Sequence, residues 1–491
     1  MVTKRSLKKQ SGVKMNLPKN GIEKGELFSQ MEAVRKNDIK WKEGKAFSLV
    51  FNGGQELSDI IKEAYCLFFS ENGLNPSAFP SLKKFENEVV GMTAGLLNGG
   101  EKAAGTMTSG GTESILMAIK TAREWAKENK PHIKEPELIM PISAHPAFNK
   151  GGHYFGVKVI SIPTKKDYRA DVEAMKAAIN ENTIMLVGSS PSYPQGVIDP
   201  IQDIASLAQE NNLLMHVDAC VGGIVLPYYK KLGADIPPFD FSVPGVTSMS
   251  VDLHKYGYAA KGASVVLYKN KELRRHQFYV TTDWPGGMYG SPAVLGTRPG
   301  GAIAAAWAIM NYLGEEGYLK LIGKIKETTE EFKRRIANLN DIQVAGEPDM
   351  SVICLISNTI DVFQVGDAMA KRGWHMDMQQ DPNGLHLTIS AAHATSIDEF
   401  FKDLEEAITE AKGLGNKIGG MKTAMAKGLL KTMPKKMVSK MVKKEGQSVG
   451  KTDARPAKMA PMYGMMAAIT DNQDRETLVK DALDNLFSPR P

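Results

Sequence analysis

Two charged residues in the middle of the chain could carry out chemistry at a substrate carbon. Asp218 ends the apolar run Leu213-Leu-Met-His-Val-Asp218, and Lys255 follows some tens of residues later in Leu253-His254-Lys255. A lysine can form a Schiff base with an aldehyde, and a carboxylate can keep a pyridine nitrogen protonated. Pyridoxal 5'-phosphate needs both groups, because its protonated ring is the electron sink of the reaction. The pair therefore predicts a pyridoxal-phosphate enzyme.

A third motif lies upstream and suits the phosphate of such a cofactor. The segment Thr108-Ser-Gly-Gly-Thr112 opens a helical pattern, and its glycines and hydroxyls would let an anion approach the first N–H groups of the helix. Each motif is weak by itself, since most lysines lie on surfaces and Asp218 could be a helix N-cap. The order of the three motifs along the chain favours cofactor binding.

The length and composition are those of a globular protein with a large core. Of 491 residues, 42% are hydrophobic and 24% are charged, and the net charge of +6 gives no reason to expect a nucleic-acid partner. Three scattered cysteines, Cys66, Cys220 and Cys354, predict a reducing compartment without a disulfide framework or a metal site. No run approaches the roughly 20 apolar residues of a membrane span, so we expect a cytoplasmic protein.

Strand and helix patterns alternate between residues 91 and 320 and predict an α/β fold. Short β-rich runs occur at 137–140, 157–160, 184–187, 213–217, 248–251 and 264–267. Helical patterns occur between them at 113–129, 171–180 and 200–211. This alternation indicates a mostly parallel sheet with helices on both faces, and ligands of such sheets bind at the carboxyl ends of the strands.

The chain is expected to divide into six parts. They are a disordered basic arm (1–20), an N-terminal helical segment (21–90), a large domain (91–320), a smaller C-terminal α+β domain (321–413), a basic Met/Lys-rich segment (414–460) and a last part containing a helix (461–491). The arm lacks the apolar core of a secretory signal, although a transit peptide stays open. Between 417 and 444, apolar residues recur every four positions among lysines. This pattern suits contact with an anionic membrane surface, packing on the protein itself, or disorder.

Several motifs resemble those of the sphingosine-1-phosphate lyase family, which are fold-type I pyridoxal-phosphate enzymes related to the group II amino-acid decarboxylases. The motifs are Ser109-Gly-Gly-Thr-Glu-Ser114, Ser143-Ala-His-Pro-Ala-Phe148, Pro191-Ser-Tyr-Pro194, His216-Val-Asp-Ala-Cys220, Val251-Asp-Leu-His-Lys-Tyr-Gly-Tyr258, Asp283-Trp-Pro-Gly-Gly287 and Arg298-Pro-Gly-Gly301. The resemblance implies the fold-type I architecture, with a seven-stranded, mostly parallel sheet and a smaller C-terminal α+β domain.

The resemblance also implies roles at the cofactor. Lys255 would be the Schiff-base lysine, Asp218 the partner of the pyridine nitrogen, and His145 the histidine that stacks on the ring. A structural role in the core is the alternative for His145. Cys220, close to Asp218 in sequence, is interpreted as packing.

The same resemblance points to a phosphate site shared between two subunits. Gly111, Thr112 and His254 resemble the residues that bind the cofactor phosphate. Thr297 falls where the family sends a hydroxyl from the second subunit to that phosphate. We therefore expect a homodimer with shared active sites, in which the stretch 283–301 lies at the interface unless it is an ordinary loop.

At the substrate end, two residues match the family and two depart from it. Tyr193 could move a proton or bind an anionic group, and Lys261 could bind a phosphate. A family tyrosine and a family histidine appear replaced by Phe51, which cannot donate a hydrogen bond, and Asn75, which cannot carry charge. Asn72 remains available in the loop that holds Asn75. The cofactor chemistry is therefore predicted more firmly than the substrate.

Three functions follow from these observations. The leading hypothesis is a lyase that breaks a carbon–carbon bond of a phosphorylated long-chain amino alcohol by retro-aldol cleavage, giving a fatty aldehyde and phosphoethanolamine. The alternative is an amino-acid decarboxylase, because the cofactor residues are shared by both classes. A non-catalytic scaffold that uses the basic segment is the third, and the presence of both Lys255 and Asp218 argues against it.

Overall fold

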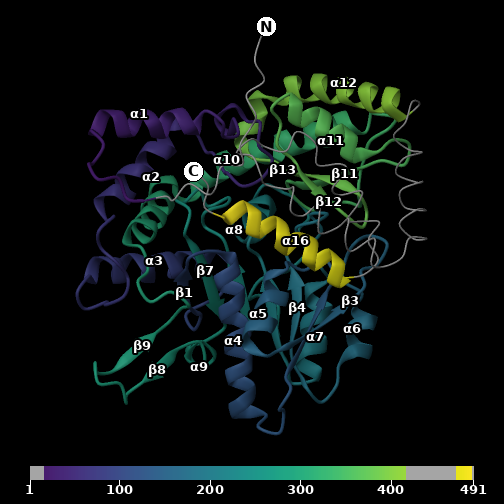
Figure 1. Ribbon diagram of the computed structural model, residues 1–491. Coiled ribbons are helices and arrows are strands. Elements are labelled where there is room, and N and C mark those ends of the chain that lie inside the picture. The colour runs from purple at the N-terminus through teal and green to yellow at the C-terminus, as the bar shows by residue number, and fades with distance from the viewer. Residues whose placement is uncertain (1–15, 416–471, 489–491) are drawn as a thin grey trace. The chain divides into compact units, whose positions relative to one another are not determined.

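The computed structural model describes residues 16–415 and 472–488 (Figure 1). The chain divides into two compact units. The larger comprises Trp41–Val362 and His375–Lys402, and the smaller comprises the described parts of Met1–Lys40, Phe363–Trp374 and Asp403–Pro491. The expected basic arm and Met/Lys-rich segment fall mostly outside the described residues.

The larger unit is built on a seven-stranded sheet. Its strands are β1 (Ala104–Thr108), β2 (Glu137–Pro141), β3 (Lys158–Ile162), β4 (Thr183–Ser189), β5 (Leu214–Asp218), β6 (Ser248–Val251) and β7 (Ser264–Tyr268). Their order is β1-β7-β6-β5-β4-β2-β3, and β7 runs antiparallel to both of its neighbours while the other pairs are parallel. The mostly parallel sheet of the predicted fold class is confirmed. Strand β1 was not predicted, because its sequence, Ala-Gly-Thr-Met-Thr, contains few large apolar residues.

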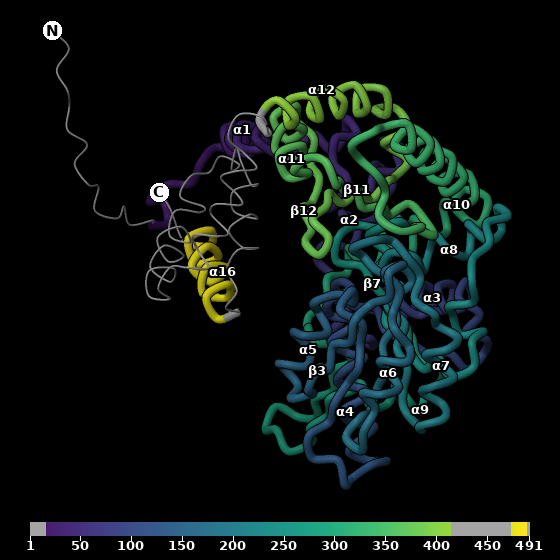
Figure 2. Tube along the Cα trace, turned by 90° about the vertical axis from the view of Figure 1, so that its right-hand side faces the viewer, coloured from purple at the N-terminus to yellow at the C-terminus, as the bar shows by residue number. Residues whose placement is uncertain are grey.

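Helices cover both faces of this sheet, as the strand side chains require. Leu138 and Met140 of β2 belong to one buried apolar cluster, whereas Ile139 between them belongs to another. Successive strand residues point to opposite faces, so each face needs its own cover. Helices α4 and α5 contribute to the first cluster, and α6, α7 and α8 contribute to the second. Figure 2 shows α5 and α7 on opposite sides of the strands.

The helices of the larger unit are α2 (Gln55–Leu67), α3 (Pro80–Leu96), α4 (Gly111–Asn129), α5 (Ala147–Phe155), α6 (Val172–Ala178), α7 (Ile201–Glu210), α8 (Gly222–Lys231), α9 (Lys271–Arg275), α10 (Gly300–Ile336) and the 3-10 turns Trp41–Glu43 and Ala391–Thr395. Helices α4, α6 and α7 confirm the patterns predicted at 113–129, 171–180 and 200–211, whereas α5, α8 and α9 were not predicted. The long helix α10 is interrupted at Gly314, whose φ of 54° is not helical. Between α9 and α10, β8 (Tyr279–Thr281) and β9 (Tyr289–Ser291) form a hairpin.

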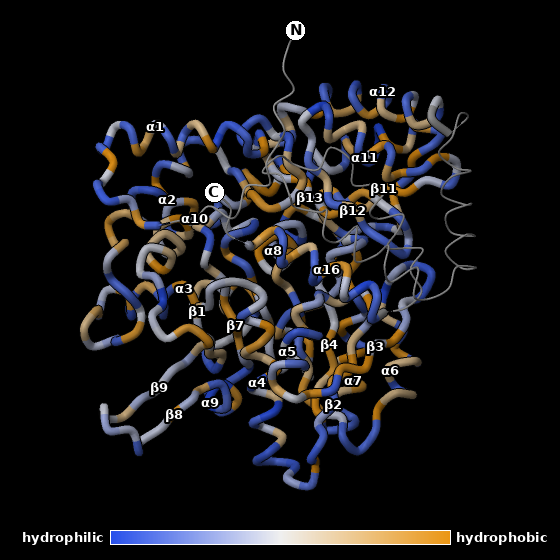
Figure 3. Tube along the Cα trace, viewed as in Figure 1, coloured by the Kyte–Doolittle hydropathy of each residue, from blue (hydrophilic) through white to orange (hydrophobic). Residues whose placement is uncertain are grey.

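A second, smaller sheet lies in the same unit. Its strands are β10 (Gln343–Val344), β11 (Val352–Ile356), β12 (Asp377–Gln379) and β13 (Gly384–Thr388), antiparallel in the order β10-β11-β13-β12. The chain around Phe47 is attached to it, because the Phe47 N–H donates to the His375 carbonyl and the Thr388 N–H donates to the Phe47 carbonyl. Figure 3 shows that strands of both sheets are largely hydrophobic.

The smaller unit consists of helices, and polar side chains join the segment after α11 to α12. It contains α1 (Lys24–Arg35), most of α11 (Val362–Lys371), the last part of α12 (Ile397–Gly415) and α16 (Asn472–Phe487). Arg372 binds Glu406 and Glu410, and the indole N–H of Trp374 donates to Asp403 at 2.7 Å. Within the described residues, no helix has the length and apolar character needed to cross a membrane.

Candidate active site

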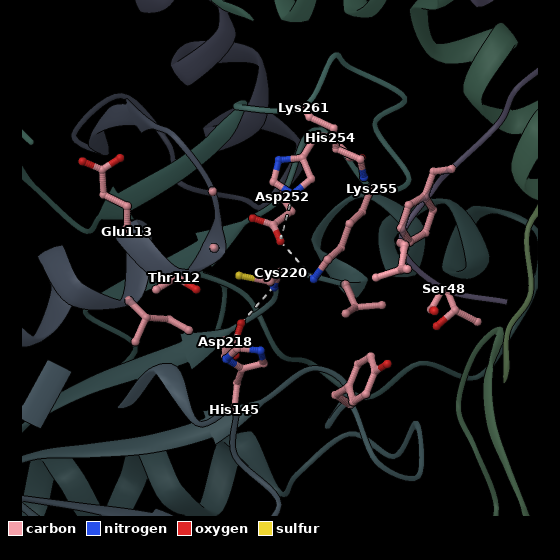
Figure 4. Close-up of a pocket in the computed structure, with 18 of the residues that line it drawn as sticks. Ser48, Thr112, Glu113, His145, Asp218, Cys220, Asp252, His254, Lys255 and Lys261 are labelled. Atoms are coloured by element: carbon pink, nitrogen blue, oxygen red, sulfur yellow. Dashed lines mark hydrogen bonds and ion pairs between the residues drawn. The ribbon is translucent and has the colours of Figure 1, made fainter. Parts of the chain in front are cut away.

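A cavity of about 620 Å³ opens at the carboxyl edge of the large sheet (Figure 4). This volume is within the range of roughly 300–1,000 Å³ typical of small-molecule sites. Nine of the residues singled out from the sequence line it: Phe51, Gly111, Thr112, His145, Tyr193, Asp218, His254, Lys255 and Lys261. The structure therefore brings together residues that are more than 200 positions apart.

Asp218 is the last residue of β5, and its carboxylate is held by one donor that follows β5 and one donor on the neighbouring strand β6. Its Oδ1 accepts hydrogen bonds from the Cys220 N–H at 3.1 Å and from the Ser250 hydroxyl at 3.0 Å. The buried His216 imidazole lies on the same strand, and burial lowers its pKa to about 4, so it is neutral. The cavity thus receives a carboxylate whose orientation is set by two donors.

Lys255 forms an ion pair with a carboxylate that the sequence analysis missed. Its Nζ lies 2.9 Å from Oδ2 of Asp252, and Nε2 of His254 lies 3.8 Å from the same oxygen. Burial disfavours the charged lysine, but the attraction of Asp252 outweighs it and raises the Lys255 pKa. Asp252 precedes Lys255 by three residues in the loop after β6, a spacing that could have suggested the pair.

The start of α4 leaves room for an anion. Gly110 is the N-cap of this helix, and a Cβ there would have only the His254 imidazole within 4 Å, at 3.5 Å, so the space beside the first N–H groups of the helix is open. Gly111, the first helical residue, packs closely on its neighbours, because a Cβ there would lie 2.7 Å from the Cys220 sulfur and 2.9 Å from the Asp252 carboxylate. Nδ1 of His254 is buried and has no hydrogen-bond partner among the described residues. An unpartnered donor at a helix N-terminus is suited to a phosphate.

Glu113 connects the phosphate loop (residues 108–112) to the segment that carries Thr297. Its Oε2 accepts a hydrogen bond from the Ser109 N–H at 2.6 Å. Its Oε1 accepts from the N–H groups of Val294 at 2.7 Å and Leu295 at 3.0 Å. The carboxylate is buried, so these three donors replace the water it would otherwise bind.

His145 lies in the loop between β2 and α5, and its imidazole lines the cavity. Nδ1 accepts a hydrogen bond at 3.1 Å from the N–H of Ala147, the first residue of α5. An accepting Nδ1 places the ring proton of the neutral imidazole on Nε2. The ring is therefore held in one orientation with one N–H to offer.

Lys261 and Phe51 lie together at the substrate end. The Lys261 Nζ is 5.5 Å from the centroid of the Phe51 ring, and this ring packs edge-on against Tyr256 at 4.8 Å between centroids. Burial and the nearby Lys255 lower the Lys261 pKa to about 8. The phenylalanine that replaces a family tyrosine thus supports the aliphatic stem and charge of the lysine rather than offering a hydroxyl.

Three residues expected at the site do not line the cavity of their own chain: Asn72, Asn75 and Thr297. The Asn75 side chain accepts hydrogen bonds from the N–H groups of Ser77 and Ala78, so it forms a turn before α3. Asn72 accepts from the Leu74 N–H. Thr297 is exposed.

The cavity also contains residues that the sequence did not single out. Ser48 comes from the segment joined to the small sheet, and Asp377 and Thr388 come from β12 and β13. No sequence pattern identified them, because they become neighbours of Tyr193 only when the two sheets pack in one unit.

Comparison with known proteins identifies the family. The profile described as "Pyridoxal-dependent decarboxylase conserved domain" matches residues 8–357. The chain belongs to the pyridoxal-dependent decarboxylase family.

Individual relatives within this family carry a narrower name. A sphingosine-1-phosphate lyase of Arabidopsis thaliana is 45% identical over 80% of this chain and 74% of its own. Sphingosine-1-phosphate lyase 1 of Rattus norvegicus is 44% identical over 80% of this chain and 70% of its own. The solved structure of a Burkholderia pseudomallei sphingosine-1-phosphate lyase is 38% identical, covers 83% of this chain and 95% of its own, and has a TM-score of 0.78.

The cofactor of this family is pyridoxal 5'-phosphate, and the cavity fits it. The buried Nδ1 of His254 and the open space beside Gly110 could hold its phosphate. Asp218 and Lys255 supply the carboxylate and the amine that its ring and aldehyde require.

We expect Glu113→Gln to weaken cofactor binding about tenfold, because the amide keeps one acceptor and turns an N–H₂ toward backbone donors, at a cost of about 1–3 kcal/mol. Titration of the apoenzyme with pyridoxal phosphate, followed by visible absorbance, measures this affinity. Glu124→Gln, on the same helix but bound only to Arg123 and Lys127 in the described structure, is the control. An unchanged affinity in Glu113→Gln would contradict the proposed link.

Proposed function

We propose that this protein is a pyridoxal-phosphate-dependent lyase that cleaves sphingosine-1-phosphate or a close sphingoid analogue. The support is the 45% identity to a sphingosine-1-phosphate lyase over 80% of the chain, together with a cavity in which the cofactor residues converge. The bond between the amine-bearing carbon and the hydroxyl-bearing carbon breaks. The hydroxyl oxygen loses its proton and its carbon leaves as the carbonyl of a fatty aldehyde. The electron pair of the broken bond stays with the amine carbon, which gains a proton and leaves in phosphoethanolamine.

At the cofactor end, three side chains have separate roles in the reaction. When bound, pyridoxal phosphate supplies the electron sink that stabilises negative charge on the amine carbon. Asp218 would hold positive charge at the ring nitrogen, His145 would orient the ring through stacking, and Lys255 would move the proton at the amine carbon. Cys220 keeps its proton, because burial and the charge of Asp218 raise its pKa, and it acts as packing.

Anionic groups are bound at two places. Gly111, Thr112 and His254 bind the cofactor phosphate, and Lys261 attracts the phosphate of the substrate. Phe51 lacks the hydroxyl of the family residue, and Asn75 is occupied in its own turn. We propose that substrate phosphate recognition therefore rests more heavily on Lys261, and that Asn72 belongs to the loop rather than to the site of its own chain.

An amino-acid decarboxylase is the second candidate. The support is the family description itself and the cofactor residues that the two classes share. A decarboxylase would release carbon dioxide from an amino acid and leave no aldehyde.

Product analysis of the purified holoenzyme tests the choice. We expect sphingosine-1-phosphate to give equal amounts of long-chain aldehyde and phosphoethanolamine, and a panel of amino acids to give no carbon dioxide. Lys255→Ala should lose the lysine-bound cofactor, which borohydride traps in the unmodified enzyme, and should lose turnover. Carbon dioxide without aldehyde would reverse the assignment.

We further propose a homodimer with shared active sites. Several large apolar side chains on or beside the β8–β9 hairpin are exposed: Tyr279 (59%), Val280 (64%), Trp284 (57%), Met288 (87%) and Val294 (55%). Exposed apolar patches of this kind support contact with another protein surface. Thr297 is exposed in the same region, which suits a side chain that serves the site of a second copy.

Mixing inactive variants tests the sharing of sites. Lys255→Ala mixed with Thr297→Glu, whose carboxylate should repel the phosphate, is expected to recover about one quarter of the wild-type activity, because half of the dimers are mixed and each has one complete site. Lys255→Ala mixed with Asp218→Ala is the control and should stay inactive. Equal outcomes in both mixtures, after subunit exchange is verified, would exclude shared sites.

A cytoplasmic location is proposed from cysteine usage. Cys66 is exposed and free, and Cys220 and Cys354 are buried and free. Peripheral membrane contact through residues 417–444 stays a proposal on residues outside the described structure. Cosedimentation with anionic vesicles, with and without this segment, tests the contact.

The pKa of Lys261 predicts a pH dependence of substrate binding. The ammonium is charged below its pKa of about 8 and loses its proton above it. KM for the phosphorylated substrate should therefore rise about tenfold per pH unit above 8. Lys261→Arg keeps its charge and should remove this rise, and Lys261→Gln should show a high KM at every pH. The same rise in Lys261→Arg would assign the dependence to another group.

A further inference from the structure

One carboxylate in the cavity has no role in the mechanism described above. Asp377 begins β12 of the small sheet and lines the cavity beside Ser48 and Thr388. Its Oδ2 accepts a hydrogen bond from the Tyr193 hydroxyl at 2.9 Å. The carboxylate is therefore attached to the tyrosine that faces the substrate end.

Asp377 is held in the charged form. Nε2 of His375 lies 3.4 Å from its Oδ1. Burial disfavours the charge, but the nearby His375 imidazole and the hydrogen bond from Tyr193 outweigh it and lower the Asp377 pKa to about 2. His375 is itself tied to the chain at both ends of its backbone, through the Lys45 carbonyl and the Phe47 N–H.

The ring of Tyr193 is fixed as well. It stacks on the buried His386, with 3.9 Å between centroids and 18° between planes. Burial lowers the His386 pKa to about 4, so this partner is neutral, and it is bonded to Gln379 and Thr388. Gln379 also donates to the Pro194 carbonyl at 2.9 Å.

The loop that follows Tyr193 packs closely against the small sheet. Gly196 has a φ of 72°, and a Cβ there would lie 2.0 Å from the Val352 carbonyl oxygen. The Gly196 carbonyl accepts a hydrogen bond from the Asp349 N–H. With ring and loop fixed, the direction of the Tyr193 O–H bond is set by its acceptor, Asp377.

We propose that Asp377 is a positioning and specificity residue that makes the Tyr193 oxygen an acceptor for a substrate hydroxyl and excludes anionic groups from this side of the cavity. Because the phenol proton points at Asp377, the oxygen lone pairs are the part of Tyr193 available to substrate. The negative charge behind it strengthens this acceptor and repels carboxylates and phosphates.

This inference rests on the proposed retro-aldol cleavage, in which the hydroxyl-bearing carbon becomes a carbonyl. The O–H of that carbon donates to the Tyr193 oxygen, and as the substrate proton moves to Tyr193 the phenol proton moves to the Asp377 carboxylate. The substrate phosphate is directed to Lys261, which carries the opposite charge. The cavity thus separates hydroxyl recognition from phosphate recognition by the sign of the local charge.

A double-mutant cycle on the holoenzyme tests whether Asp377 acts through Tyr193. We expect Asp377→Asn and Tyr193→Phe each to lower kcat for sphingosine-1-phosphate cleavage by about tenfold or more, with KM within about twofold. The double variant should be no slower than Tyr193→Phe, because the same contact is already lost. Asp398→Asn removes a carboxylate that does not line the cavity and should behave as wild type.

The inference would be overturned if Asp377→Asn cleaved at the wild-type rate, or if the two losses multiplied in the double variant. Visible absorbance of each variant verifies that the cofactor is loaded.

A second measurement needs no turnover, so it separates this inference from the proposed function. Acetate binding to the holoenzyme is followed through the visible absorbance of the cofactor. We expect Asp377→Asn to bind acetate at least about threefold more tightly than wild type, since a repelling charge is gone, and Asp398→Asn to match wild type. If Asp377→Asn binds acetate more tightly but the wild-type enzyme fails to cleave sphingosine-1-phosphate, the exclusion of anions by Asp377 stands and the proposed lyase function is refuted. Unchanged acetate binding in Asp377→Asn would refute the exclusion of anions.

Discussion

The parallel direction of the strands is the constraint on which this site depends. Because β1, β2, β4, β5 and β6 run the same way, the loops that follow them meet at one edge of the sheet. Those loops carry the phosphate-binding turn, His145, Tyr193, Asp218 and the Asp252–Lys255 pair. The antiparallel strand β7 begins at this edge, after the loop that carries Lys255 and Lys261, and returns the chain between β6 and β1.

Residues that follow strand ends could be predicted from the sequence, and residues delivered by distant packing could not. Asp218 and Lys255 stand directly after apolar runs, where any parallel sheet presents its ligands. Asp377 stands in a short strand of the second sheet, and its meeting with Tyr193 depends on how two sheets pack. The strand β1 was missed for a local reason, since its small and polar residues are buried through neighbours rather than through their own apolarity.

The same distinction explains the expected residues that do not line the cavity. Asn75 was assigned by its place in a loop, yet its side chain is used to close the turn before α3. Thr297 was predicted to serve the active site of a second subunit, and this role stays a proposal because the structure contains a single chain. Phe51 does line the cavity, and its contact with Lys261 gives the substitution a physical meaning: the ring contacts a cation instead of offering a hydroxyl.

The three backbone donors gathered by Glu113 have a thermodynamic consequence. They join the phosphate loop, which faces the cofactor side of the cavity, to the segment after the β8–β9 hairpin, which faces the outer surface, so that the two move together as one element. If cofactor binding tightens this element, any partner that recognises the tightened form must bind the holoenzyme better than the apoenzyme. Reciprocity then requires that partner to raise the affinity of the protein for the cofactor by the same factor. Cofactor retention would thereby report on association at a surface that never touches the cofactor.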